Sequence, residues 1–263
     1  MSNRHFYLYV ILGLLTGNLR AEDAQNGWPS IDFGRFPSPL LHTRVAAYHG
    51  SPATKANLHL PEPEDLPPHM TVDFQDAREY PAYKKGARYF FPAGNNLTVY
   101  RISEVKTAPY KTIQKEIALL EKLLAGRPKS VPFREESSEL PDYPPIEGEH
   151  VFEAKLAYLN APWGSGLCYL TQYTQEPGHF ANNEELTYVF QGLSKEGSFY
   201  VSANFRVTHP KLPSGIDARP KKKETSSLND TAFLDKQSDD SFTPSLSKIR
   251  NWIGTLELDQ KSD

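Results

Sequence analysis

Cys168 is the sole cysteine of the 263-residue chain, so it is the one candidate for a thiol nucleophile. The histidines nearest to it in the sequence are His150 and His179. A catalytic Cys–His pair needs both side chains within hydrogen-bond reach and a third group that orients the imidazole. Cys168 instead stands within a run of strand-forming residues, where a cysteine usually serves as a small buried hydrophobe. We therefore predict a structural cysteine.

Other catalytic and metal-binding patterns are missing. The eight histidines include no HxH or HExxH pair, so we predict no metal and no cofactor. Glu184 and Glu185 would point to opposite faces at a strand edge, which favours exposed charges over a cooperating acid and base. The segment 164–166 (GSG) lacks the length of a GxSxG turn and indicates a hairpin turn. We therefore assign no catalytic residue.

Aromatic and amide side chains gather in and beside residues 150–207. Exposed aromatic rings next to amides can stack on, and hydrogen-bond to, a sugar or a peptide. The candidate binding residues are Trp163, Tyr169, Gln172, Tyr173, Asn183, Tyr188, Gln191 and Tyr200. In the alternative interpretation the strand aromatics fill a core and the amides lie in turns.

Strands must position these residues. The segments 150–158, 166–174, 185–192 and 198–207 are rich in Val, Phe, Tyr, Leu and Thr and are separated by short turn-like sequences. Short connections favour an antiparallel meander. In the last segment every second residue, from Phe199 to Val207, is apolar, which predicts one core face.

The remaining segments complete an α+β pattern. Residues 70–75 alternate as a strand, residues 89–102 resemble two strands joined by a turn, and residues 109–126 carry an apolar stripe at helical spacing. A closing helix would use Thr243 as its N-cap. We predict a single α+β domain over residues 69–258, with about six or seven mainly antiparallel strands, packed helices including a C-terminal one, and a polar, disordered insert at 208–241.

Two segments precede this domain. Residues 1–21 have a short polar start, an apolar run and small residues before Ala21, which is the layout of a secretory signal peptide. Residues 22–68 are rich in proline and predict an extended arm. The apolar run is about half of the roughly 20 residues that cross a bilayer, so we expect no transmembrane segment after cleavage. The expected location is secreted or periplasmic.

Charge and cysteine content exclude other classes. The net charge is −3, which argues against nucleic acid as a partner, and the basic segment 219–223 is typical of a solvated loop. Electrostatic docking of that segment to an anionic surface is the alternative. One cysteine permits no internal disulfide, so stability must come from a hydrophobic core.

Three segments carry a resemblance to known sequences. Residues 164–175 (GSGLCYLTQYTQ), 182–193 (NNEELTYVFQGL) and 197–203 (GSFYVSA) resemble a family of exported bacterial proteins with no established function. The order of elements is also similar to the sandwich fold of the photosystem P-protein and Mog1-like proteins, a likeness of fold alone. The resemblance implies an exported bacterial protein and names no activity.

We therefore expect a non-catalytic binding or interaction module that uses the 150–207 meander to contact an envelope or extracellular protein or glycan. Two alternatives stay open: a secreted hydrolase with dispersed carboxylates and histidines, and a structural envelope component. A cleft with two acids and a histidine in mutual reach would favour the enzyme. A flat face with exposed Trp163 and tyrosines would favour the binder.

Overall fold

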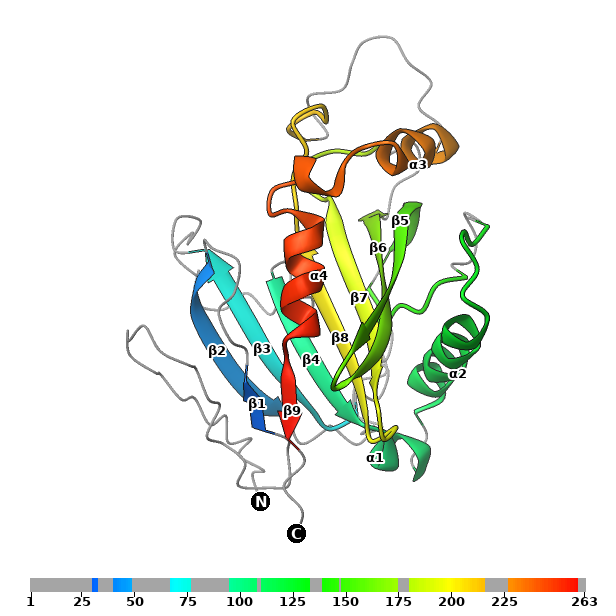
Figure 1. Cartoon of the computed structure of the whole chain (residues 1–263), viewed down its shortest axis with the longest axis vertical. Coiled ribbons are helices and arrows are strands. Elements are labelled where there is room, and N and C mark those ends of the chain that lie inside the picture. Colours follow the sequence, from blue (N-terminus) through cyan, green and yellow to red (C-terminus); the bar gives the residue numbers. More distant parts are fainter. Residues whose placement is uncertain are drawn as a thin grey trace, which may run out of the picture.

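The computed structural model describes residues 30–32, 40–48, 67–76, 95–107, 110–132, 139–146, 148–174, 180–215 and 227–259. Seven of their strands form one large antiparallel sheet (Figure 1), in the order β2-β3-β4-β8-β7-β6-β5. These strands are β2 (Leu40–Tyr48), β3 (His69–Asp76), β4 (Asn95–Arg101), β5 (Glu149–Ala161), β6 (Gly164–Thr174), β7 (Thr187–Ser194) and β8 (Phe199–Arg206). The predicted α+β class with a mainly antiparallel sheet is confirmed.

The predicted meander is confirmed in β5 to β8, which pair in sequence order. Pro162 and Trp163 form the two-residue turn between β5 and β6. Residues 164–166, which were predicted to form a turn, are instead the first residues of β6. Gly197 has φ +66° between β7 and β8, a conformation that favours glycine. β8 pairs with β7 on one side and with β4 on the other, so the sheet continues beyond β8 toward β2. At the opposite end of the strand order lies β5, beside β6.

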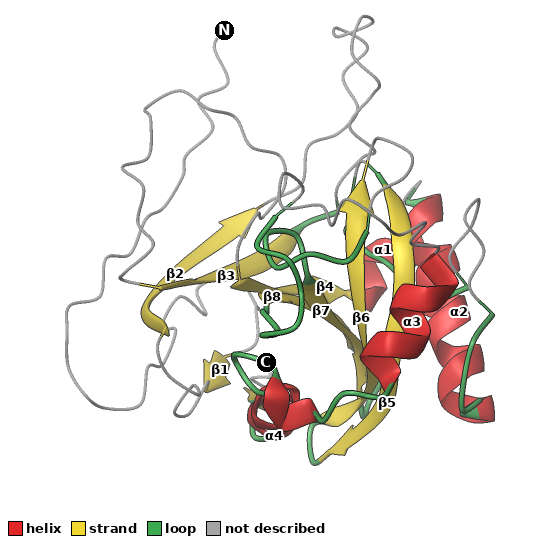
Figure 2. Ribbon diagram, turned by 90° about the horizontal axis from the view of Figure 1, so that it is seen from above, coloured by secondary structure: helices red, strands yellow, loops and turns green. Residues whose placement is uncertain are grey.

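Two helices cover opposite faces of the sheet (Figure 2). The C-terminal helix α4 (Leu246–Gly254) packs with Phe205 and Phe74, while α2 (Lys111–Gly126), which follows α1 (Ile102–Thr107), packs against the tyrosines of the other face. The prediction that one face of the 198–207 segment is core is therefore too narrow. Tyr200 and Ser202, on the second face, are as buried as Phe205.

The apolar stripe of α2 forms as predicted, with Ile113, Ile117 and Leu120 buried. Leu124 of that stripe is half-buried, and Leu123 takes the buried place. Arg127 ends the helix in a left-handed conformation, and its backbone N–H donates to the Leu123 carbonyl at 2.7 Å. The stripe thus anchors α2 on the sheet and brings Arg127 toward β5.

The N-terminal arm contains strands that its composition did not predict. β1 (Ser30–Asp32) pairs with the closing strand β9 (Glu257–Asp259), and β2 extends the large sheet beside β3. The residues predicted as an extended arm thus pair as strands at these two places, which the composition of the segment did not indicate. The predicted signal peptide and the strand expected at 89–92 lie outside the described residues.

The segment 208–241 contains helix α3 (Ser227–Asp235) and the short 3₁₀ helix η2 (Asp239–Ser241). Leu234 of α3 is fully buried in the apolar core, so the prediction of a disordered insert is wrong for this part. The basic run 219–223 lies outside the described residues. The N-cap of α4 is Ser245 rather than Thr243, because the Ser245 hydroxyl accepts the Lys248 N–H.

Within the described part of the chain, no helix combines the length and the apolar character that a membrane crossing requires.

Candidate functional site at the edge of the meander

The predicted binding residues do not form an exposed face. Six of them are buried, namely Trp163, Tyr169, Gln172, Tyr188, Gln191 and Tyr200. Tyr173 and Asn183 are half-buried. The alternative interpretation, in which the aromatics fill a core, is therefore the right one for the buried residues.

Four of these side chains hold neighbouring segments in place. The Trp163 indole N–H donates to the Ile253 carbonyl of α4 at 2.8 Å. The Tyr188 hydroxyl accepts a hydrogen bond from Arg250 at 2.8 Å. The Gln172 and Asn183 amides donate to main-chain carbonyls, of Phe180 in the first case and of residues 209 and 212 in the second. These contacts are structural.

The other four converge on residues 139–146, a segment between α2 and β5. The Tyr169 hydroxyl donates to the Pro141 carbonyl at 2.9 Å, and the Gln191 amide donates to the Tyr143 carbonyl at 3.2 Å. The Tyr200 hydroxyl in turn donates to the Gln191 side-chain oxygen at 2.5 Å. Because a segment without regular structure must find partners for its buried carbonyls, these polar side chains hold it against the sheet.

A buried ionic cluster lies at the same place. His150 Nε2 is 3.1 Å from Asp142 Oδ2, and His150 Nδ1 is 3.0 Å from Glu153 Oε1. The side chains of His150 and Glu153 are 7% and 3% exposed. Tyr173 donates to the other Asp142 oxygen, and Glu116 of α2 accepts the Asp142 N–H at 3.0 Å. The fold therefore joins two acids and a histidine that the sequence analysis did not connect.

Within this cluster the imidazole of His150 is protonated at neutral pH. Burial alone would lower the pKa of His150, but hydrogen bonds to Asp142 and Glu153 and their negative charges outweigh it and raise that pKa to about 9. Burial raises the pKa of Glu116 to about 7. At neutral pH His150 is thus a cation without a lone pair to accept a proton, and it acts as a clamp between two carboxylates.

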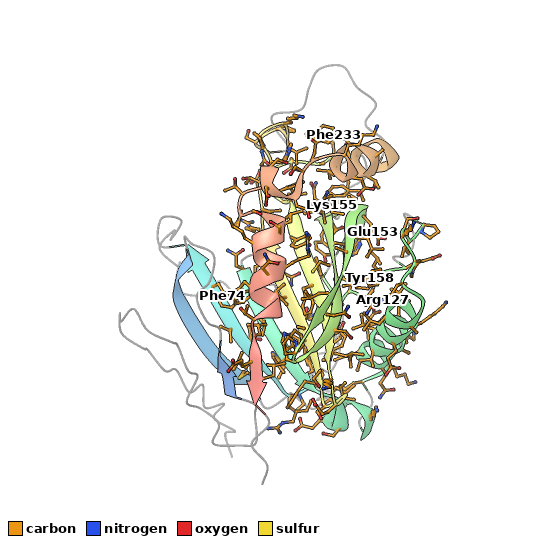
Figure 3. All side chains as sticks on the ribbon, viewed as in Figure 1. Phe74, Arg127, Glu153, Lys155, Tyr158 and Phe233 are labelled. Carbon is orange, nitrogen blue, oxygen red and sulfur yellow. The ribbon has the colours of Figure 1, made fainter. Side chains whose placement is uncertain are left out.

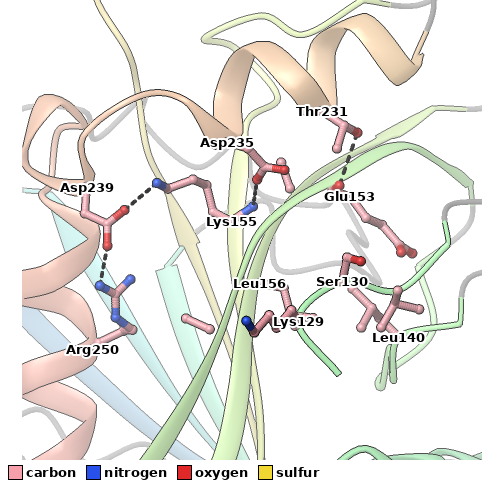
Figure 4. Close-up of a pocket in the computed structure, with 13 residues that line it drawn as sticks. Lys129, Ser130, Leu140, Glu153, Lys155, Leu156, Thr231, Asp235, Asp239 and Arg250 are labelled. Atoms are coloured by element: carbon pink, nitrogen blue, oxygen red, sulfur yellow. Dashed lines mark hydrogen bonds and ion pairs between the residues drawn. The ribbon is translucent and has the colours of Figure 1, made fainter. Parts of the chain in front are cut away.

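Next to this cluster a groove of about 310 Å³ runs along β5 (Figure 4). Five consecutive residues of β5, from Glu153 to Ala157, line it. Successive side chains of a strand point to opposite faces, so a groove lined by five in a row follows the edge of the strand. Residues 129–131 and Leu140 form one wall, and the other wall is formed by Thr231, Asp235, Asp239 and Arg250.

The wall toward α3 is already paired. The Thr231 hydroxyl donates to the Glu153 carbonyl at 3.1 Å, and the Lys155 N–H donates to Asp235 at 2.6 Å. Lys155 Nζ lies 2.7 Å from Asp239, which also contacts Arg250. Lys155 has φ +57° beside a register shift, where the strand bends toward α3. This end of the strand edge is therefore occupied by the protein itself.

The opposite wall carries Lys129, and Arg127 lies nearby beside Tyr158 (Figure 3). Lys129 is exposed and forms no ion pair with any residue that the structure describes. Arg127 is exposed as well, donates to the Asn160 side-chain oxygen at 2.6 Å, and lies 5.8 Å from the centre of the Tyr158 ring. Tyr158 donates to the Pro128 carbonyl at 3.1 Å. The α2 end of the groove can therefore attract an anionic group.

Other predicted chemistry is also located. Cys168 is fully buried in β6, where burial raises the pKa of its thiol to about 12, as fits a structural cysteine. Glu184 is exposed, whereas Glu185 accepts the amides of Gln172 and Asn182. Over the described ranges, no three His, Cys, Asp or Glu side chains are grouped to hold a metal ion.

No protein-family model, curated protein or solved structure matches this chain. The resemblance to exported bacterial proteins therefore stays a prediction.

Proposed function

We propose that this chain is an exported interaction module that binds an envelope or extracellular partner in the groove along the outer edge of β5. The observation that carries the proposal is the run of five consecutive groove-lining residues from Glu153 to Ala157. The meander keeps its predicted role, but the contact moves from a face to an edge, because both faces are covered by helices and core side chains.

Charge supports the same site. On the α3 side the cations are neutralised by Asp239, whereas Lys129 on the α2 side is available to a ligand. Ser130 beside it is exposed and adds a hydroxyl donor. A partner with a carboxylate could bind there without displacing an existing ion pair.

Binding can be tested with the purified chain and a panel of acidic probes: peptidoglycan fragments, oligogalacturonate and glutamate-containing peptides. We expect Lys129→Glu to weaken the binding of any positive probe about 10-fold, since it reverses a charge at the site. Lys122→Glu, at an exposed position of α2 outside the groove lining, is the matched control and should leave affinity unchanged. Equal affinity in the wild type and Lys129→Glu would refute the groove as the binding site.

A hydrolase is the second candidate, favoured by the contact of Asp142 and Glu153 with His150. Glu153 belongs both to this cluster and to the groove lining. The clamp role of His150 places this candidate second. If a panel of glycoside, ester and peptide substrates is hydrolysed, and Glu153→Gln abolishes turnover while Lys122→Glu does not, the enzyme would replace the binder.

A further inference from the structure

We infer that the partner is an extended peptide segment with acidic side chains, which continues from the groove along residues 156–161 and joins the sheet there as an additional strand beside β5. This inference rests on the proposed function and names the class of its partner. It follows from the main-chain groups of the strand edge, from the residues that guard that edge, and from the charges beside it.

The second half of β5 directs main-chain groups outward that no described residue pairs. Ala161 and Gly164 flank the two-residue turn, so they form the first hydrogen-bonded pair of the β5–β6 hairpin. The antiparallel alternation then directs the N–H and C=O groups of Tyr158 and Asn160 away from β6. Among the described residues, none forms a hydrogen bond to these four outward groups.

In the first half of the same edge, the outward main-chain groups are hydrogen-bonded to side chains of α3. There α3 supplies a donor to the Glu153 carbonyl and an acceptor to the Lys155 N–H, as a neighbouring strand would. For the next six residues, 156–161 (LAYLNA), no described residue supplies such a partner to the outward main-chain groups. These six residues include no charged residue and no proline. Edge strands usually carry such residues, which prevent pairing with a strand of another chain. An open, uncharged edge of this kind accepts a peptide strand.

The neighbouring charges specify acidic side chains. Arg127 and Lys129 are exposed beside residues 156–161, and neither forms an ion pair within the described part of the chain. The two acids of the groove wall toward α3 are already engaged, because Asp235 accepts the Lys155 N–H and Asp239 pairs with Lys155 and Arg250. A peptide strand beside residues 156–161 would therefore place its carboxylates near Lys129 of the groove and Arg127 beside Asn160, two cations without an ion-pair partner among the described residues.

Fluorescence anisotropy with designed peptides tests this inference. The probe is a labelled octapeptide of alternating Val and Glu, compared with a Val–Lys octapeptide and with the Val–Glu octapeptide N-methylated at every peptide nitrogen, which leaves neither edge with an N–H donor. We expect the Val–Glu probe to bind, and both comparison peptides to bind about 10-fold more weakly, because one has the wrong charge and the other cannot pair its main chain. Equal binding of the N-methylated peptide would overturn the inference.

Variants of the chain separate this inference from the proposed function. Asn160→Pro removes one outward N–H and leaves the pairs with β6 in place, so it should abolish Val–Glu binding. Asn160→Ala keeps that N–H and loses the Arg127 contact, and it should bind as the wild type does. If oligogalacturonate binds in a Lys129-dependent way and the Val–Glu probe does not, the groove function stands and the peptide inference fails.

Two further outcomes decide against the inference. Absence of Lys129-dependent binding of both probes would overturn the inference and the proposed function together. A concentration-dependent dimer that Asn160→Pro abolishes, measured by sedimentation velocity, would assign the edge to a second copy of this chain.

Discussion

The sheet face under α4 and the sheet face under α2 are made by alternate residues of the same strands, yet their chemistry differs. Under α4 the packed side chains are mostly apolar, such as Phe190, Phe205 and Trp252. Under α2 the large side chains are tyrosines, including Tyr169 and Tyr200, and the ionic cluster lies beside them.

The difference follows from what covers each face. The face under α4 meets a helix, whose main-chain groups are mostly paired within the helix, with the Ile253 carbonyl at its end accepting the Trp163 N–H. The rest of this contact is mainly apolar. The face under α2 also meets residues 139–146, which are not in a helix or strand. The carbonyls of Pro141 and Tyr143 in this segment accept side-chain hydrogen bonds. One face thus depends on burial, and the other on polar groups that respond to pH.

The largest expected effect tests the apolar face. Trp252 of α4 is 4% exposed and packs edge-on against Phe74 and Phe205. Trp252→Ala should lower the free energy of unfolding by about 3–5 kcal/mol through lost contacts and a cavity. Urea titrations at pH 6 and pH 9 should give the same loss. A loss that differs between the two values would contradict the assignment of this face as insensitive to pH.

The next effect tests the clamp on the other face. His150→Ala leaves Asp142 and Glu153 as buried carboxylates without their shared cation and should cost about 3 kcal/mol at pH 7. Adding Glu153→Gln removes one of these charges and should recover part of the loss. The two variants are compared by urea denaturation. If the double variant is less stable than His150→Ala, charge imbalance is not the cause.

The wild type should show the same effect through pH. The folded pKa of His150, about 9, lies above its ordinary value of 6.5, so its contribution is complete below pH 6.5 and is lost as pH rises through 9. For Glu116 the contribution is complete below its ordinary 4.5 and is lost as pH rises through 7. These two contributions should therefore make stability fall from about pH 4.5 to about pH 9, and His150→Ala should flatten the part of this curve above pH 6.5. An unchanged slope in the variant would contradict the assignment.

The smallest effect concerns a single hydroxyl. Tyr169→Phe removes the donor to the Pro141 carbonyl and should lower the free energy of unfolding by about 1–2 kcal/mol. Tyr158→Phe, on the half-buried edge strand, removes the donor to the Pro128 carbonyl where water can replace it, and should cost less. Thermal denaturation of both variants measures the difference. A larger loss for Tyr158→Phe would reverse the expected order.

Local patterns were sufficient for much of the fold. The alternation around Phe199 and the stripe around Ile117 predicted β8 and α2, because each element must bury one set of residues at its own period. The second buried face was missed because Tyr200, Ser202 and Asn204 are residue types that also suit a solvated face. Their burial depends on α2 and on residues 139–146, which the alternation of one strand cannot indicate.

The candidate site was mostly beyond sequence reasoning. Glu116 and Asp142 belong to separate segments, and only their packing on β5 brings them to His150. The Pro-rich composition of residues 22–68 likewise hid β2, whose pairing is decided by the partner strand β3. The one usable signal was the stretch 156–161, which is uncharged in the sequence but could not be recognised as an edge.

The sequence by itself determined the α+β class, the meander of β5 to β8, the helix at α2 and the structural character of Cys168, because these depend on local periodicity and residue type. The tertiary structure alone decided the strand order that leaves β5 at the end of the sheet, the burial of the predicted binding residues, and the meeting of Asp142, His150 and Glu153. These features depend on contacts between residues distant in the chain, whose free energy is set only when the sheet and both covering layers are assembled.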